Sequence, residues 1–147
     1  MNAAALADIA ALPSVIQEAV DRGDMDAFAA TISRNCIFEI ARGGGDPMRF
    51  EGRDAILAMT RGALAGKGSQ VDLVHVVGSV RAQQSSETRA SVQSICLFVG
   101  TGPSLSIEGL GHYDDDLIFE DGRWQFLERR IRMTLGAGMA AGLQLKK

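Results

Sequence analysis

The residues of this chain best suited to proton transfer are its two histidines, His75 and His112. Both stand in stretches that read as β-strands, and residues 71–77 surround the first imidazole with β-branched, apolar neighbours. Imidazole titrates near neutral pH, so a half-buried histidine can act as a general base with little tuning. A core histidine that only satisfies a hydrogen bond produces the same pattern. On its own, the run 71–77 fits this structural role somewhat better.

Two carboxylates could assist an imidazole. In the predicted strand 104–119, Glu108 and His112 are two alternation steps apart and point to the same face. If that face turns inward, the interior holds a carboxylate and a second imidazole; if it turns outward, both are ordinary solvent-facing groups. Asp21 ends a predicted helix, where the helix dipole disfavours a carboxylate. Pairing with an imidazole would compensate for this cost, whereas an exposed aspartate next to Arg22 is the alternative.

The elements that position these groups begin with three predicted helices in the first 65 residues. Apolar residues that recur at three- and four-residue steps predict helices over 14–22, from about 25 to 32, and over 53–65. The predicted boundary residues are Pro13 at the start of the first helix, Gly23 at its end, Asp24 as N-cap of the second and Gly66 as C-cap of the third.

Strands dominate the rest of the chain. The run 43–47 contains three consecutive glycines and is expected to be a mobile loop. Asp121 and Gly122 supply the backbone geometry of a tight hairpin turn. The predicted strands are 36–40, 71–81, 88–100, 104–119 and 123–133.

Helices followed by antiparallel strands predict a single α+β domain over residues 1–147, with helices packed on one face of a curved sheet. Residues 71–81 are apolar on both faces, which indicates helices on one side and an enclosed pocket on the other. The tail from about 134 to 147 could close over the sheet as a lid or contact a neighbouring subunit.

Composition narrows the class of protein. Fifteen basic and eighteen acidic residues give a net charge of −3. The Lys and Arg residues form no stripe along the chain, so we do not expect nucleic acid as a partner. Cys36 and Cys96 each lie in an apolar strand-like run, as buried cysteines do in a reducing compartment. We expect no signal peptide and no apolar stretch of membrane-spanning length, so the predicted location is the cytoplasm.

Six short motifs follow one another in a recognisable order from about residue 10 to 133: 20–25, 35–39, 50–56, 75–81, 111–117 and 121–124 with Arg129. In the order and spacing of these motifs, the sequence resembles the SnoaL-like group of the nuclear-transport-factor-2-like superfamily. The resemblance implies a cone-shaped α+β barrel, in which helices surround a strongly bent sheet with an apolar cavity at its wide end.

The scytalone dehydratase and hexachlorocyclohexane dehydrochlorinase branch of that superfamily carries an Asp–His pair at the matching places. Carried over, Asp21 orients His75 and raises its basicity, and His75 removes a proton from carbon. A buried carboxylate would fix the imidazole tautomer and stabilise the imidazolium that forms. Val20 stands where the dehydratase has a tyrosine, so that part of its site is missing here.

Further departures concern the acid that would complete the reaction. Tyr113, the only tyrosine, is predicted to lie on the opposite face of its strand from His112. Glu108 stands near the place of a basic residue that assists a departing halide in the dehydrochlorinase. A carboxylate cannot stabilise a halide, which argues against dehalogenation. The expected acid partner of His75 is therefore Glu108 or His112.

We accordingly expect a cofactor-free lyase or isomerase that acts on a hydrophobic, cyclic or aromatic small molecule. Elimination of water is the first choice, and retro-aldol cleavage of a C–C bond stays open. The alternative is a non-catalytic ligand-binding or assembly subunit, like the small subunits of ring-hydroxylating dioxygenases. The side chains expected to contact the substrate are Phe38, Leu73, Gln93, Ile95, Leu97, Leu110 and Trp124.

Two further expectations concern metals and assembly. His75, His112 and Glu108 are ligand types for iron or zinc, but they are spread over two strands without a local spacing signature, so we expect no metal. The convex sheet face and the tail 135–141 leave more apolar surface than three short helices can cover. We therefore expect a homo-oligomer, either a dimer or a trimer.

Overall fold

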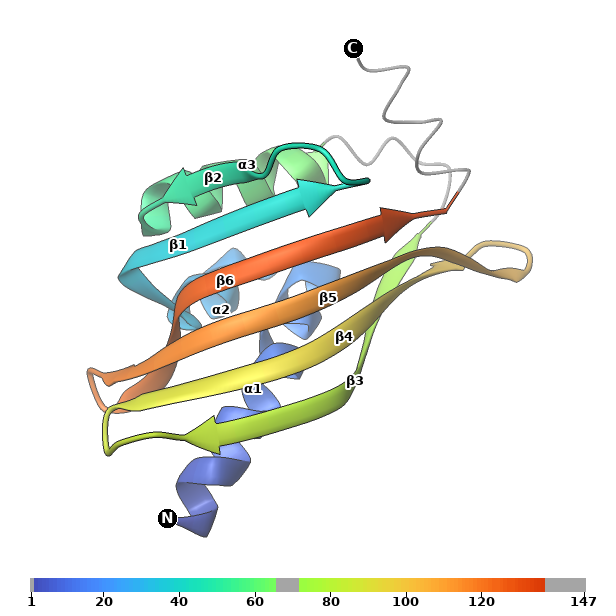
Figure 1. Ribbon diagram of the computed structural model, residues 1–147. Coiled ribbons are helices and arrows are strands. Elements are labelled where there is room, and N and C mark those ends of the chain that lie inside the picture. Colours follow the sequence, from blue (N-terminus) through green and yellow to red (C-terminus); the bar gives the residue numbers. More distant parts are fainter. Residues whose placement is uncertain (1, 66–71, 137–147) are drawn as a thin grey trace.

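The computed structural model describes residues 2–65 and 72–136 and forms one layer of helices against one layer of sheet (Figure 1). Six strands are arranged in the order β2-β1-β6-β5-β4-β3. All neighbouring strands pair antiparallel except β1 and β6, which pair parallel. The elements are α1 (Ala3–Arg22), α2 (Met25–Ala30), β1 (Ile32–Arg42), β2 (Met48–Glu51), α3 (Arg53–Ala65), β3 (Leu73–Gln84), β4 (Arg89–Thr101), β5 (Leu105–Glu120) and β6 (Arg123–Leu135).

Helix α1 begins eleven residues earlier than predicted, at Ala3 rather than Ser14, and Pro13 lies inside it. The start is set by Asn2, whose side chain accepts a hydrogen bond from the backbone N–H of Ala4 at 2.9 Å. Alanine has the highest helix propensity, so the alanine-rich segment continues the helix backward past the proline. Tertiary packing outweighs the missing N–H of Pro13, because the buried ring belongs to the core.

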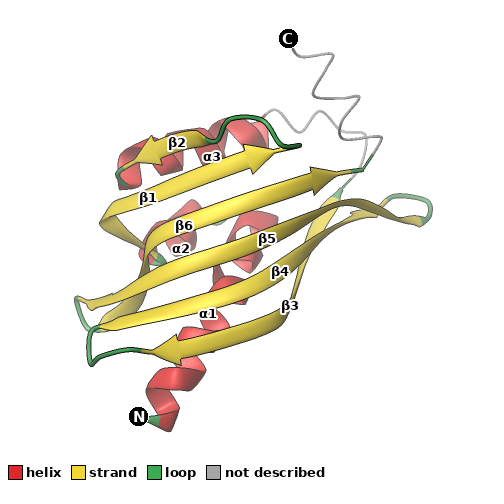
Figure 2. Ribbon diagram, in the orientation of Figure 1, coloured by secondary structure: helices red, strands yellow, loops and turns green. Residues whose placement is uncertain are grey.

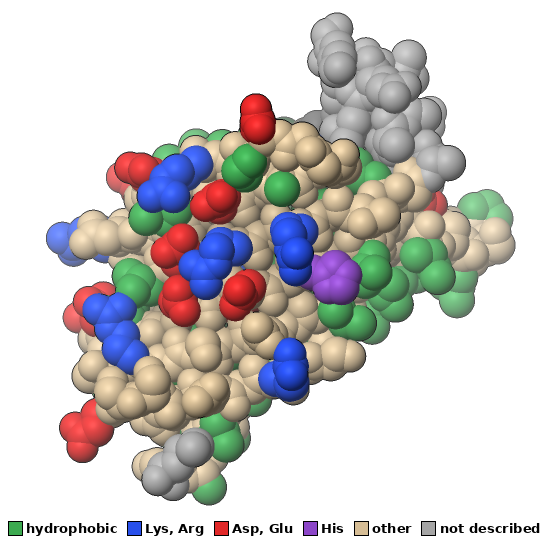
Figure 3. Space-filling model, viewed as in Figure 1, with side chains coloured by type: hydrophobic (Ala, Val, Ile, Leu, Met, Phe, Trp, Pro, Cys, Tyr) green, Lys and Arg blue, Asp and Glu red, His purple; other side chains and the backbone are tan. Residues whose placement is uncertain are grey.

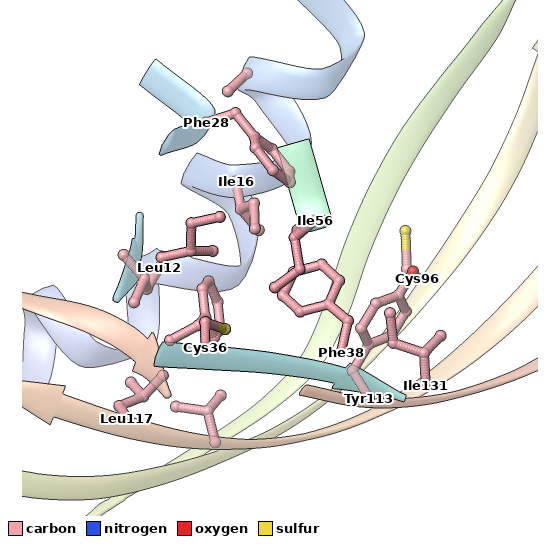
Figure 4. Close-up of a cluster of buried hydrophobic side chains, with 14 of the residues drawn as sticks. Leu12, Ile16, Phe28, Cys36, Phe38, Ile56, Cys96, Tyr113, Leu117 and Ile131 are labelled. Carbon is pink, nitrogen blue, oxygen red and sulfur yellow. The ribbon is translucent and has the colours of Figure 1, made fainter. Parts of the chain in front are cut away.

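By length and composition alone, α1 could cross a membrane, contrary to the expectation that no stretch approaches that length. In the fold it has another role. Ile9, Leu12 and Ile16 recur at three- and four-residue steps and are at most 8 % exposed. This stripe packs into the core between the helices and the sheet, as the apolar face of an ordinary core helix does (Figure 4).

The predicted helix boundaries hold at several capping residues. Gly23 ends α1 in the left-handed conformation with φ 68°, and Asp24 caps α2 by accepting the backbone N–H of Ala27 at 3.0 Å. Helix α2 ends at Ala30, so Ile32 does not continue it but begins β1, where its side chain is fully buried. The predicted cap Gly66 and the tail 137–147 lie outside the described residues.

The strands follow the prediction with two differences. Strand β1 is longer than 36–40, because Ile32 pairs with Phe126 of β6 before an irregular stretch and pairing continues to Arg42 at the other end. Strand β2 was not predicted. The short β2 pairs with β1 across the glycine-containing connection 43–47, which the sequence predicts to be a mobile loop. The predicted turn between β5 and β6 is confirmed, since Asp121 and Gly122 both have positive φ, 53° and 76° (Figure 2).

The two faces of the sheet have different surroundings. The helix-facing side contributes Phe38, Cys96, Tyr113 and Ile131 to the core, and Figure 4 shows these side chains directed toward the helices. The other side, which we call the helix-free face, carries charged side chains over its middle and hydrophobic side chains toward one end (Figure 3). A residue's face therefore decides whether it can contribute to an interior site.

Candidate active site

Asp21 and His75 form a two-point contact between α1 and β3. The Oδ1 atom of Asp21 lies 2.5 Å from Nδ1 of His75, and its Oδ2 accepts the backbone N–H of His75 at 3.0 Å. The two side chains are 19 % and 14 % exposed, so the pair is largely removed from solvent but still reachable. The structure thus brings together the two residues that the sequence singled out as a pair.

The local fold explains why this carboxylate meets this imidazole. β3 is an edge strand, so alternate backbone N–H groups along it have no partner strand. Helix α1 packs against β3, and its last turn brings Asp21 to the free N–H of His75. The left-handed cap at Gly23 ends the helix immediately afterwards, which keeps Asp21 at that edge.

The contact orients the imidazole for use as a base. A neutral imidazole that donates its Nδ1 proton to a carboxylate keeps the lone pair on Nε2. The ring is also held by Phe98, which packs edge to face against it with ring centroids 5.2 Å apart. The structure therefore holds His75 in one orientation, with Nε2 as the atom available to accept a proton.

A second polar pair lies one helical turn away. Gln17 precedes Asp21 by four residues on α1, is buried, and lies near enough to Tyr113 that it lowers the pKa of the phenol, against the larger effect of burial. Positions four apart on a helix share one face, with Cβ atoms about 5–6 Å apart. Burial raises the pKa of the Tyr113 phenol, so this group stays protonated and can donate a hydrogen bond at neutral pH. Tyr113 therefore belongs to the same interior region as His75.

A glycine makes this position of the phenol possible. A Cβ atom on Gly111 would lie 2.5 Å from Cε2 and 3.3 Å from Oη of Tyr113. The ring therefore lies along its own strand over Gly111, a place that any larger residue would occupy. Gly111 pairs with Cys96, which in turn pairs with Val77, two residues from His75. The phenol is thus directed toward the end of the sheet that holds His75.

Beneath Tyr113, the helix-facing side of the sheet contains a buried ion pair. Arg129 donates from Nε and Nη2 to the two carboxylate oxygens of Asp115, at 2.9 and 3.1 Å, and the two residues are 2 % and 0 % exposed. The guanidinium carbon lies 4.5 Å from the ring centroid of Tyr113 and 4.3 Å from that of Phe126. This bidentate geometry satisfies both charges and anchors the phenol from below.

The structure separates His112 from His75. His112 pairs with Ile95, and Ile95 pairs with Gly78, whereas His75 pairs with Phe98. Because side chains alternate along a strand, the row of His112 faces away from the row of His75. His112 is exposed on the helix-free face, so the expectation that it shares an interior site with His75 is wrong.

Glu108 lies in the part of β5 that is two strands from His75, because Gly109 pairs with Phe98 and Phe98 pairs with His75. It is the extra residue of a β-bulge, where pairing shifts from Phe98 with Gly109 to Val99 with Ile107. Its carboxylate accepts a hydrogen bond from the Ser106 hydroxyl at 2.5 Å. No contact joins it to His75 among the hydrogen bonds and ion pairs of the described residues. The structure thus contradicts His112 as the acid partner of His75, whereas Glu108 in that role stays a prediction.

The predicted substrate contacts divide between three places. Phe38 and Leu73 lie on the helix-facing side with His75. Trp124 packs against Phe119 at the opposite end of the sheet from His75, at a centroid distance of 5.4 Å. The remaining four are on the helix-free face because they share the alternation of His112: Gln93, Ile95, Leu97 and Leu110.

Five cavities lined by described residues lie beside the start of α1, on the helix-free face and beside Gly52. Neither Asp21 nor His75 lines any of these, so the predicted apolar pocket around the pair stays a prediction. Within 2–65 and 72–136, no three side chains of the metal-binding types converge. The candidate ligand set His75, His112 and Glu108 is divided between separate places, as described above.

Sequence reasoning missed Tyr113, Gln17 and the Arg129–Asp115 pair as parts of this region. Tyr113 could have been identified from the strand alternation of β5. It lies on the opposite face from its neighbour His112, and that face is the one that also carries His75. Gln17 was identifiable as the residue one turn before Asp21 on the same helical face. Only the register of β3, β4 and β5 decides which of the two faces is the interior one.

Comparisons with known proteins agree with this fold. The SnoaL-like domain family matches residues 2–130. Three similar solved structures come from Novosphingobium aromaticivorans. One, named "Putative Scytalone Dehydratase", is 24% identical with a TM-score of 0.65, over 88% of this chain and 83% of that chain. An ntf2-like protein with a cystatin-like fold is 17% identical with a TM-score of 0.68, over 98% and 90%.

The third is the beta subunit of a "putative aromatic-ring-hydroxylating dioxygenase", 13% identical with a TM-score of 0.72, over 90% of this chain and 91% of that chain. At these identities, the three likenesses show the fold alone. A comparison with curated proteins finds no match. The predicted α+β fold of the nuclear-transport-factor-2 type, with N-terminal helices on a mostly antiparallel six-stranded sheet, is confirmed.

Proposed function

This chain belongs to the family of SnoaL-like domains, and from that premise we propose that it is a lyase or isomerase in which His75 removes a proton from carbon. The observation that carries the proposal is the two-point contact of Asp21 with the ring and backbone of His75. An orienting carboxylate on Nδ1 is the arrangement that prepares Nε2 of an imidazole as a general base. The structural neighbours share the fold and do not identify a reaction.

The proposed step is an elimination of water. Nε2 of His75 takes a proton from a substrate carbon, and the electrons of that C–H bond form a carbon–carbon double bond. The C–O bond on the neighbouring carbon breaks, and its hydroxyl leaves as water with the proton that the His75 imidazolium gives up. The carboxylate of Asp21 stabilises the imidazolium that forms. Removal of a hydroxyl proton by the same base would instead begin a retro-aldol cleavage.

Tyr113 is the proposed donor to the leaving oxygen, in place of Glu108 and His112. Its phenol lies on the same side of the sheet as His75, and α1 spaces its partner Gln17 one turn from Asp21. Burial keeps this phenol protonated, so it can donate a hydrogen bond to a hydroxyl or carbonyl oxygen. The proposed substrate is therefore a hydrophobic small molecule with a hydroxyl or carbonyl oxygen that reaches the phenol while its C–H bond meets Nε2 of His75.

One observation favours a non-catalytic role as second candidate. Phe98 packs edge to face against the His75 ring and so occupies interior space beside the Asp21–His75 pair. A ligand-binding or assembly subunit would use the same fold without turnover. One structural neighbour with this fold is named as the beta subunit of a "putative aromatic-ring-hydroxylating dioxygenase".

The test is turnover of a panel of hydroxylated aromatic and alicyclic compounds, monitored by mass spectrometry for loss of water. His75→Ala should abolish turnover, and Asp21→Asn should lower it by about 10²- to 10⁴-fold, because the charge that supports the imidazolium is gone. Tyr113→Phe should lower it by about 10²-fold or more if the phenol donates in the reaction. Circular dichroism checks that each variant is folded.

His112→Ala is the matched control, since it removes an imidazole from the helix-free face and should leave turnover unchanged. A folded His75→Ala variant with near-normal turnover would contradict the proposed mechanism. Full activity of a folded Tyr113→Phe variant would show that Tyr113 is not part of the mechanism, and would leave the role of His75 unaffected. Binding of panel compounds without turnover by the wild-type protein would support the non-catalytic candidate instead.

A further inference from the structure

A hollow of about 610 Å³ lies on the helix-free face, on the other side of the sheet from the Asp21–His75 pair. Basic side chains from three strands line it: Arg81 of β3, His112 of β5 and Arg132 of β6. We propose that this hollow, which we call the arginine hollow, binds a small carboxylate that carries a short alkyl or aryl group. Cavities that bind small molecules usually have volumes of about 300–1,000 Å³, so its size fits such a ligand.

The strand register brings two of these basic side chains together. His112 and Arg132 are direct partners on β5 and β6, so their side chains stand next to each other. Figure 3 shows the imidazole of this face in purple beside a basic side chain in blue, at the border between the charged and the hydrophobic areas. Like charges in direct cross-strand contact repel each other, which happens here whenever the imidazole is protonated. An anion bound between the two groups would remove that repulsion.

The basic side chains of the arginine hollow have no acidic partner. Within residues 2–65 and 72–136, none of the three takes part in an ion pair, and the remaining residues of the chain include no Asp or Glu. Arg130, two residues before Arg132 on the same face, pairs instead with three carboxylates. Arg81 donates from Nη2 to Oε1 of Gln93 at 2.5 Å, and this neutral acceptor keeps the guanidinium at the rim of the hollow. Both guanidinium charges are therefore available to an anion.

The charge of the lining favours a ligand with a single negative charge. Asp114 is the one acidic side chain among the described residues of the lining, and its Oδ1 lies 3.8 Å from Nη2 of Arg130. Two arginines and one aspartate leave a net charge of +1 when His112 is neutral. A carboxylate matches this charge, and its two oxygens accept the fork of N–H donors that a guanidinium presents. A phosphate monoester carries about two negative charges at pH 7 and would be repelled more strongly by the Asp114 carboxylate.

The arginine hollow also has an apolar surface for the rest of the ligand. Ile95 lines it and pairs with His112 on one side and with Gly78 on the other. Gly78 has no side chain, and a Cβ atom there would meet no atom within 4 Å, so the space beside Ile95 is open toward the edge of the sheet. A short alkyl or aryl group would cover Ile95. Val76 and Ile107, at the apolar end of this face, do not line the hollow.

The arginine hollow is independent of the proposed reaction. Its lining side chains alternate to the face opposite His75, so the sheet itself separates the two places. Failure of the lyase proposal would therefore leave this site unaffected, and the reverse also holds.

The probe is sodium hexanoate, titrated into the full-length protein by calorimetry at pH 7 in about 0.15 M salt. Saturable binding of one hexanoate per chain is expected. Hexylammonium chloride has the same apolar chain and the opposite charge. It should bind at least about tenfold more weakly, because a hydrogen bond to a charged group is worth about 1.5–3 kcal/mol.

Three variants locate the binding. Arg81→Gln and Arg132→Gln should each weaken hexanoate binding about tenfold or more, because each removes one charged donor. Gly78→Val should also weaken it, because the new side chain would occupy the open space beside Ile95. This variant should fold, since its Cβ meets no atom within 4 Å and valine favours strands.

Arg89→Gln is the matched control. It removes the same charge from an exposed position of β4, four residues or ~13 Å along the strand from Gln93. That separation exceeds the Debye length of about 8 Å in this salt, so hexanoate affinity should stay unchanged. The proposal is overturned if about 10 mM hexanoate produces no saturable heat, if hexylammonium binds as tightly, or if Arg89→Gln weakens binding as much as Arg132→Gln does. A lower mass of Arg132→Gln in light scattering, with hexanoate binding unchanged, would assign the hollow to a carboxylate of a second copy and would also overturn it.

Discussion

At the scale of single residues, position on a face decides chemical role. Asp21 occupies the end of a helix, where the dipole disfavours its charge, and the contact with His75 supplies the compensation. His112 carries the same imidazole but lies exposed on the helix-free face. Of the two imidazoles, only that of His75 is held by a carboxylate inside the fold, so only His75 is a candidate general base.

The two cysteines yield a prediction for thiol reactivity. Burial raises the pKa of Cys36 and of Cys96 from about 9 to about 12. The thiolate is the reactive form, so both should resist iodoacetamide at pH 8 in the folded protein and react in urea. Mass spectrometry of the alkylated protein measures this. Rapid modification of either thiol in the folded protein at pH 8 would contradict the buried placement.

The same shifts imply a loss of stability in alkaline solution. Between about pH 9 and 12 the folded protein keeps thiol protons that the unfolded chain releases, so the free energy of unfolding falls as pH rises. The slope is at most about 1.4 kcal/mol per pH unit for each thiol. Urea unfolding at pH 8 and 10 checks the sign, and Cys36→Ala should reduce the difference between the two.

The buried ion pair of Arg129 and Asp115 yields a prediction for stability. Arg129→Met should lower the free energy of unfolding by about 3–5 kcal/mol, because it leaves the Asp115 carboxylate buried without its charge partner. The double variant Arg129→Met with Asp115→Leu should lose less than the sum of the two single variants. Urea unfolding measures all three, and strict additivity would show that the pair does not act as a unit.

At the scale of elements, edge and irregular geometry set up the interior site. β3 is an edge strand with a β-bulge after Gly78, and Ser79 takes the left-handed conformation there with φ 49°. A bulge bends and twists its strand. The bend follows the segment that carries His75, whose free N–H is the one that Asp21 accepts. Strand position and helix end together determine the contact.

Gly111 yields a prediction at this scale. Gly111→Ala should displace the ring of Tyr113, because the new Cβ would lie 2.5 Å from Cε2. We expect a loss of about 1–3 kcal/mol in the free energy of unfolding, the usual cost of overpacking, and reduced turnover once a substrate is known. Gly62→Ala in α3 is the control: its Cβ would meet no atom within 4 Å, and helix propensity predicts a gain of up to about 1 kcal/mol. Equal stability of the two variants would contradict the close packing of Tyr113.

At the scale of the whole molecule, the helix-free face lacks a covering layer among the described residues. Hydrophobic side chains gather toward one end of this face (Figure 3). That end carries Val76, 47 % exposed, and Ile107, 70 % exposed, and the cross-strand partners of Val76 are Leu97 and then Leu110. Its middle carries Arg130, which pairs with three carboxylates: Asp114, Asp116 and Glu128. An apolar area rimmed by charges is typical of a surface that contacts a protein partner.

We propose that this face joins two or three copies of the chain. Light scattering at micromolar concentration should show a dimer or trimer, and Val76→Asp should shift it toward the monomer by placing a charge in the interface. Val15→Asp is the matched control, since Val15 is 44 % exposed on α1 and should leave the assembly unchanged. A monomeric wild-type protein would refute the proposal. The cytoplasmic location and the hydrophobic small-molecule substrate stay predictions.

The sequence by itself determined the family, the α+β class, the hairpin at Asp121 and the candidate pair Asp21–His75, since these depend on local propensity, turn chemistry and motif order. It also determined that Tyr113 and His112 point to opposite faces of one strand. Which face is the interior depends on strand register and on where the helices pack, and these are contacts between residues far apart in the chain. Only the tertiary structure therefore placed His112 outside, Tyr113 inside and Trp124 at the opposite end of the sheet from His75.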